Sequence, residues 1–167
     1  TDTDTDTDTD EESESNISIL DPSEVESITE TNITLNFDGG AGISLGYATL
    51  LSTQPDTNLI ALTTWDPECT DTDISSWLSS SCPDMECTML VLEHETGWDV
   101  SSNVSAWANN FGSESWTTTA FEDDTQLEVE APLEDWDGDI GDTLDGRLTI
   151  TGGMLEASGS FTATICD

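Results

Sequence analysis

Apolar and polar residues alternate over short segments from about residue 16 onward, and Gly, Asp, Ser or Pro separates the segments. Alternation with a period of two is typical of a β-strand that buries one face. Thr, Ile, Val and aromatic residues, which favour strands, are frequent in these segments. The strands predicted in this way cover residues 16–20, 32–37, 43–51, 58–65, 86–94, 115–121, 125–131, 142–151 and 158–166.

Residues 43–51, ISLGYATLL, form one of the longer alternating segments. If they form a single strand, the pattern points Ile43, Leu45, Tyr47 and Leu51 toward the core.

Residues 86–94 are nearly continuously apolar from Met89 to Leu92, which is typical of a central strand. Helix is expected only as one or two short turns, in residues 71–81 and 103–111. The pattern therefore predicts an all-β protein, an antiparallel β-sandwich or jelly roll of eight or nine strands.

The chain begins with TDTDTDTDTD and stays acidic to about residue 15. We therefore divide it into a low-complexity tail, residues 1–15, and a single β-sandwich domain, residues 16–167. The tail has two interpretations. It is a linker, because it has no apolar side chain to bury, or it is a strand with one Thr face and one Asp face that adds to a neighbouring subunit.

The charge is extreme: 37 Asp and Glu stand against one basic residue among Lys and Arg, which gives a formal net charge of −36. Nucleic acid and anionic membrane surfaces are excluded as partners, because binding either one requires clustered cations. A compact anion of this kind repels itself, so we expect a setting rich in salt or divalent cations.

Four cysteines in a chain without a redox or haem motif predict two disulfides and an oxidising compartment. Of the three possible pairings, the favoured one joins Cys69 to Cys82 and Cys87 to Cys166. There is no run of about 18 apolar residues that could span a bilayer, and we interpret the chain as a mature exported form.

Residues 134–146, EDWDGDIGDTLDG, concentrate aspartates among glycines. Hard cations such as Ca²⁺ prefer several oxygen ligands from a flexible loop of this type. The first aspartates are spaced as in an EF-hand, but the later Gly and Glu of that loop are absent. The alternative is an acidic hairpin loop, and residues 122–125 are a weaker candidate of the same kind. The predicted Ca²⁺ ligands are Asp135, Asp137, Asp139 and Asp142.

The sequence provides little for catalysis, and we expect that the protein is not an enzyme. Residues 42–46, GISLG, match a nucleophile elbow around Ser44, but strands rather than a helix are predicted on both sides. His94 is the only histidine, and we interpret it as a solvent-facing residue at a strand end. With 37 acidic residues, no carboxylate pair can be chosen for glycoside hydrolysis.

Two further features bear on the surface of the molecule. The sequons for N-glycosylation are at Asn16, Asn32 and Asn103. Six tryptophans are expected mainly in the core, although Trp98 and Trp136 lie in polar segments where their rings could face a sugar or a neighbouring subunit.

The opening TDTDTDTDTD, followed by a β-rich domain that includes DTLDGRLTITGGMLEASGSFTATIC, resembles secreted surface proteins and lipoproteins of myxobacterial type. Those proteins carry a Thr/Asp-rich spacer after the export signal. The chain is also similar to salt-adapted archaeal surface proteins in its acidic Thr-rich segment. The resemblance implies a location outside the cell.

These features together predict an extracellular or cell-surface structural or adhesive protein, a subunit that self-assembles into a filament or layer by strand addition. The alternative is a monomeric, Ca²⁺-dependent module that binds carbohydrate or another surface ligand, with the metal at Asp137, Asp139 and Asp142.

Overall fold

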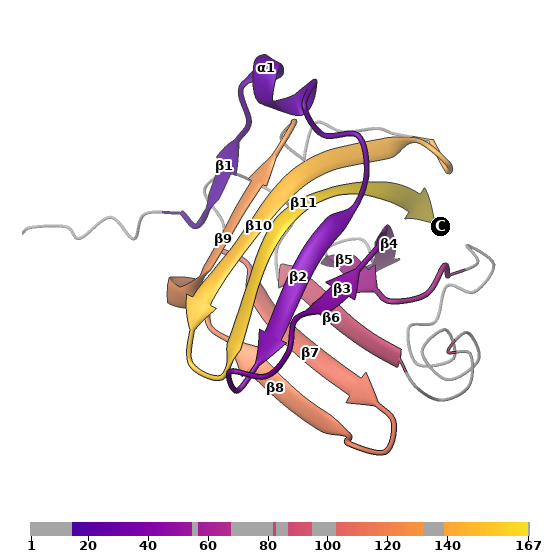
Figure 1. Ribbon diagram of the computed structural model, residues 1–167. Helices are drawn as coiled ribbons and strands as arrows, with labels where there is room; N and C mark the ends of the chain where they lie inside the picture. Colours follow the sequence, from indigo (N-terminus) through magenta and orange to yellow (C-terminus); the bar gives the residue numbers. More distant parts are fainter. Residues whose placement is uncertain are drawn as a thin grey trace, which may run out of the picture.

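A computed structural model of the chain describes residues 15–54, 57–67, 82, 87–94, 103–131 and 139–166. These residues form a short helix α1 (Pro22–Val25), a 3₁₀ turn η2 (Glu122–Asp124) and otherwise strands and their connections (Figure 1). The all-β prediction is therefore confirmed. The strands are β1 (Ile17–Ile19), β2 (Asn32–Phe37), β3 (Ile43–Leu45), β4 (Tyr47–Gln54), β5 (Thr57–Thr63), β6 (Cys87–His94), β7 (Ser105–Phe111), β8 (Trp116–Ala120), β9 (Thr125–Val129), β10 (Thr143–Gly152) and β11 (Leu155–Cys166).

The strands form one curled sheet, in the order β1-β9-β10-β11-β4-β5-β6-β7-β8, and β2 and β3 branch from β11. Most neighbours are antiparallel, as expected for hairpin-connected strands. Two pairs are parallel, β1 with β9 and β11 with β4. The sheet is thus mixed, whereas the alternation pattern predicted a purely antiparallel arrangement.

Strand β11 organises the sheet, because three strands pair with it. One of its edges pairs with β10 along most of its length. The other edge pairs first with β2, as far as Ser160 opposite Asn32, and then with β4, from Ala163 opposite Ala48. Thr162 lies between these two pairings on β11. Its amide donates to Thr31 Oγ1 at 3.0 Å instead of to a strand carbonyl. The change of partner from β2 to β4 leaves a local gap in the outer face of the sheet.

The main core lies on the inner, concave face of the curled sheet. Leucines and isoleucines of β2, β9, β10 and β11 meet those of β5 and β6 there. At its rim Phe37 of β2 stacks on Trp116 of β8, with ring centroids 4.2 Å apart. Figure 1 shows these two strands meeting at the lower side of the molecule. Phe37 is half-buried and therefore lies at the rim of the core rather than at its centre.

Strand β6 is buried on both faces from Cys87 to Leu92, as predicted for a central strand. It lies between β5 and β7. Its alternate residues Met89 and Val91 join a second, smaller cluster on the outer face, together with Trp65.

Residues 43–51 do not form a single strand. Gly46 separates β3 from β4, and its amide donates to the Thr63 carbonyl at 3.1 Å. Because β3 pairs with β2 while β4 pairs with β5 and β11, the chain changes direction at this point. Tyr47 consequently lies on the outer face with 42% exposure, and its predicted inward orientation is wrong.

The short helix expected in residues 103–111 is also wrong, because these residues contain β7. Ala106 and Ala108 are buried opposite Leu92 and Leu90 of β6, and Ser105, which precedes Ala106 in the strand, is exposed. Pairing with a central apolar strand therefore overrides the weak helical preference of this segment. The helix expected in residues 71–81 falls outside the described residues.

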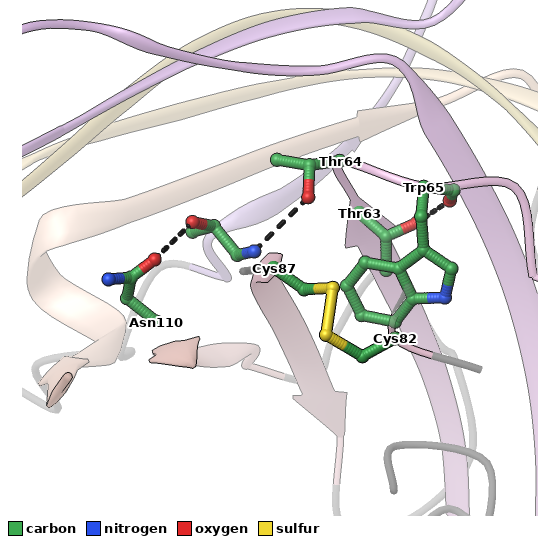
Figure 2. Close-up of a disulfide and its surroundings, with 7 residues drawn as sticks. Thr63, Thr64, Trp65, Cys82, Cys87 and Asn110 are labelled. Carbon is green, nitrogen blue, oxygen red and sulfur yellow. Dashed lines mark hydrogen bonds between the residues drawn. A yellow bond between two sulfur atoms is a disulfide. The ribbon is translucent and has the colours of Figure 1, made fainter. Parts of the chain in front are cut away.

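The disulfide pairing favoured from the sequence is wrong, because Cys82 bonds to Cys87. Their Cα atoms are 5.9 Å apart across a sequence separation of 5, which lies within the usual range for a disulfide. Figure 2 shows the Trp65 indole beside this disulfide, and both belong to the outer-face cluster. Cys166 is also disulfide-bonded, and its partner is outside the described residues.

We predict that replacing both Cys82 and Cys87 with serine lowers the free energy of unfolding by about 2 kcal/mol, the chain-entropy value for so short a loop. Cys87 is almost fully buried, so the lost packing adds to this effect. Thermal unfolding of the variant and the parent, in the same salt, measures the difference. Equal midpoints would show that the bridge contributes nothing to stability.

Candidate functional site

The junction between the acidic tail and the folded domain is fixed by Asn16. Its Nδ2 donates to the Val104 carbonyl at 2.7 Å, and its Oδ1 accepts from the Val104 amide at 2.8 Å. The same Nδ2 donates to the Glu122 carbonyl at 2.9 Å. The Asn16 backbone amide donates to Asn103 Oδ1 at 3.2 Å. One side chain therefore joins the start of β1 to the segment before β7 and to η2, and it sets where the tail leaves the domain.

The outer strands of the sheet each have one edge without a partner strand among the described residues. β8 pairs with β7 only, and β1 pairs with β9 only. β8, residues WTTTA, carries no carboxylate, and its Thr117 and Thr119 are exposed. Such an edge presents a row of backbone N–H and C=O groups that another strand can bind.

A groove of about 410 Å³ lies beside β1, where the tail leaves the domain. Its walls include the carboxylates of Glu122, Asp123 and Glu128, and no basic residue is among the described residues that line it. The groove is therefore a region of negative potential.

The single arginine binds helix α1. Arg147 Nη1 lies 2.7 Å from Glu24 Oε1, and Glu24 Oε2 also accepts from the Asp21 amide at 3.2 Å. The hydrogen bond from Arg147 lowers the pKa of Glu24, and the bond from the Asp21 amide lowers it further. The only guanidinium of the chain thus anchors α1 to β10 and leaves the other acidic residues without an arginine partner.

We predict that Arg147→Gln raises the pKa of Glu24 toward its ordinary value. Because the folded-state pKa is lowered, the pair stabilises the fold above the ordinary glutamate pKa, and this contribution is lost as the pH falls through the lowered value. NMR titration of the Glu24 carboxyl carbon in both proteins measures the change. A Glu24 pKa that is the same in both would contradict the assignment of the shift to Arg147.

The predicted Ca²⁺ loop is only partly within the described residues, because Asp135 and Asp137 fall outside them. Asp139 and Asp142 close a tight turn, in which the Asp139 amide donates to Asp142 Oδ2 at 2.9 Å. Both side chains are exposed. No group of three or more candidate metal ligands occurs within the described ranges. Calcium at this loop stays a prediction.

The other candidates from the sequence are dispersed. Ser44 lies within β3, paired with Thr34, so it is not at the strand-to-helix turn that a nucleophile elbow requires. His94 is the last residue of β6, and the prediction that its side chain faces the solvent is not tested, because that side chain is not among the described ones. Glu122, Asp123 and Asp124 form η2.

Of the three sequons, Asn32 is exposed in β2, whereas Asn16 Nδ2 already donates two hydrogen bonds. Asn103 is half-buried, and its Oδ1 accepts from Asn16. Glycosylation of Asn16 would replace one of the two Nδ2 hydrogens and so break at least one of these bonds, and Asn32 is therefore the sequon most open to modification. The sequence pattern alone could not distinguish them.

Comparison with known proteins gives no match to a family model, a curated protein or a solved structure. In the described part of the chain, no helix has the length and apolar character needed to cross a membrane.

Proposed function

We propose that the protein is an extracellular structural or adhesive subunit that assembles by strand addition. In this arrangement the Thr-Asp segment, residues 1–10, of one copy pairs with the free edge of β8 in the next copy. The observation that carries the proposal is that β8 has a partner strand on one side only among the described residues. Backbone hydrogen bonds would supply the affinity, as in other β-augmented complexes.

Length and charge favour β8 of another copy as the acceptor. Fourteen extended residues reach roughly 45 Å from Ser15, several times the length of a five-residue strand. The β8 edge is free of carboxylates, whereas the groove beside β1 is lined by three. The tail therefore meets less repulsion at a neighbouring β8 than at its own β1.

The Asp side of the added strand would face other carboxylates, so the proposal requires cations. Na⁺ at high concentration, or Ca²⁺, would offset this repulsion. A saline exterior supplies both, and the Cys82–Cys87 disulfide is consistent with an oxidising compartment.

Assembly of the purified protein tests the proposal. We expect filaments or layers by negative-stain electron microscopy in about 1 M NaCl with Ca²⁺, and their loss when residues 1–10 are deleted. A second variant keeps the length of the tail and every aspartate, so it separates loss of strand pairing from loss of charge. It carries Thr3→Pro and Thr7→Pro, which remove N–H donors from the added strand. It should also fail to assemble.

Unchanged assembly after the deletion would overturn strand addition by the tail. A parent protein that stays monomeric under all these conditions would overturn self-assembly itself and favour the monomeric binding module. In that case the effect of EDTA on the unfolding midpoint would test whether Ca²⁺ is part of the module.

A further inference from the structure

A small cavity of about 190 Å³ opens on the outer face of the sheet, where β11 changes partner from β2 to β4. Thr164 of β11 and Thr49 of β4 lie opposite each other in the parallel pair, and both line the cavity. Thr31 and Thr162, whose paired hydrogen bonds bridge the end of β2, line it as well. The cavity is thus built by the sheet itself, at the gap between two strands that share one edge.

The Thr49 side chain differs from most of the buried threonines, and it is the one that lines this cavity. Thr49 is only 3% exposed and lines the cavity, yet its hydroxyl forms no hydrogen bond with any described residue. By contrast, the buried hydroxyls of Thr63, Thr88 and Thr125 each donate to an oxygen. A hydroxyl that opens into a cavity and bonds no described residue is available both to donate to a ligand and to accept from it.

The rest of the cavity specifies the chemistry of the ligand. Tyr47 lies at the cavity with 42% exposure, so part of its ring is open to a ligand. Asp66 supplies one exposed carboxylate. The described lining contains no cation, which disfavours phosphates, nucleotides and acidic sugars. Threonine hydroxyls both donate and accept hydrogen bonds, as sugar hydroxyls do, and an aromatic ring packs against the apolar face of a sugar.

We propose that this cavity binds one pyranose ring of a neutral glycan. The ring lies against Tyr47, and its hydroxyls bond to Thr49 and Asp66 at the gap between β2 and β4. The site uses no residue of the predicted Ca²⁺ loop and none of the tail, so it does not depend on assembly. A monomeric protein without residues 1–10 is therefore a suitable test molecule, provided that it keeps the parent's amide spectrum.

The experiment is an NMR titration of ¹⁵N-labelled protein with the methyl glycosides of glucose, galactose, mannose and N-acetylglucosamine, with glucuronic acid as the acidic comparison. We expect at least one neutral glycoside to bind with a Kd on the order of 1 mM, to shift the amides of residues 47–49 and 162–164, and to bind at least about tenfold more tightly than glucuronic acid. Absence of binding by all four neutral glycosides up to about 50 mM, well above that Kd, overturns the proposal.

Three variants then locate the site. Tyr47→Ala should weaken binding about tenfold, and Thr49→Val about fivefold, because each removes one contact of a weak ligand. Thr118→Val is the matched control, since Thr118 is 9% exposed, also forms no side-chain hydrogen bond with a described residue, and lies on β8 away from the cavity. Unchanged binding by Tyr47→Ala and Thr49→Val, or equal losses in all three variants, contradicts the assignment. Tyr47 is exposed, so its variant is informative even if Thr49→Val does not fold.

Discussion

Transfer of the protein from about 1 M NaCl to a salt-free buffer that contains EDTA should lower its unfolding midpoint by about 10 °C or more, which is about 3 kcal/mol for a domain of this size. The chain carries 37 acidic residues, and its only Lys or Arg, Arg147, is already paired with Glu24. Without salt the screening length grows several-fold, so carboxylates on the same side of the sheet repel one another over the whole domain. This repulsion raises the free energy of the compact folded state more than that of the expanded unfolded chain.

A second measurement in the same experiment separates charge repulsion from other effects of salt. Acidification of the salt-free sample toward pH 4 should recover part of the lost stability, because ordinary aspartate and glutamate side chains begin to take up protons there. Differential scanning calorimetry at each condition measures the midpoint. A midpoint that is independent of NaCl between 10 mM and 1 M would show that cation screening does not maintain this fold.

Gly146→Ala should destabilise the protein by about 3 kcal/mol or more, with a fall in the unfolding midpoint of about 10 °C. Gly146 lies in β10, directly opposite Phe161 of β11, and the Phe161 ring covers it. A Cβ at this position would overlap the ring and would come within 2.8 Å of the Glu128 carbonyl oxygen. The ring is fully buried and the carbonyl belongs to β9, so neither can move without disturbing the sheet.

The control for this substitution is Gly46→Ala, since a Cβ at Gly46 would meet no atom within 4 Å. We expect a change of less than about 1 kcal/mol there. A second variant, Gly146→Ala combined with Phe161→Leu, should recover part of the loss by making the opposing side chain smaller. Chemical denaturation of the four proteins measures these differences. Similar losses for Gly146→Ala and Gly46→Ala would show that the contact with Phe161 is not the cause.

The local pattern predicted those elements whose burial alternates within one strand. Residues 32–37 form β2 as expected, because Ile33 and Leu35 face the core between exposed polar residues. The pattern could not show that Gly46 separates two strands, because Leu45 and Ala48 on either side of it are both buried. That break depends on which strands β3 and β4 pair with, and those partners are distant in the sequence.

Pairing over long sequence distances also explains the other errors. The Cys82–Cys87 bond could not be chosen among three pairings by spacing alone. Strand β7 was mistaken for a helical turn, because its alternating burial arises only beside β6. The proposed glycan site could not be predicted either. Nothing in the sequence around Thr49 indicates that its hydroxyl opens into a cavity, because the cavity forms where β2 gives way to β4 on β11. Threonine is too common in this chain to identify a site by itself.

The central place of β11 has a consequence for how the molecule acquires its structure. Of the described strands it is the last to be synthesised, and it holds β10, β2 and β4 together. Strand β1 likewise cannot pair until β9 has been synthesised, because its partner residues come about 110 positions later. Ile17, for example, lies opposite Leu127. So high a contact order predicts slow folding. The nascent chain cannot close its sheet while β11 is still missing, and we therefore expect the sheet to close only after synthesis has passed residue 166.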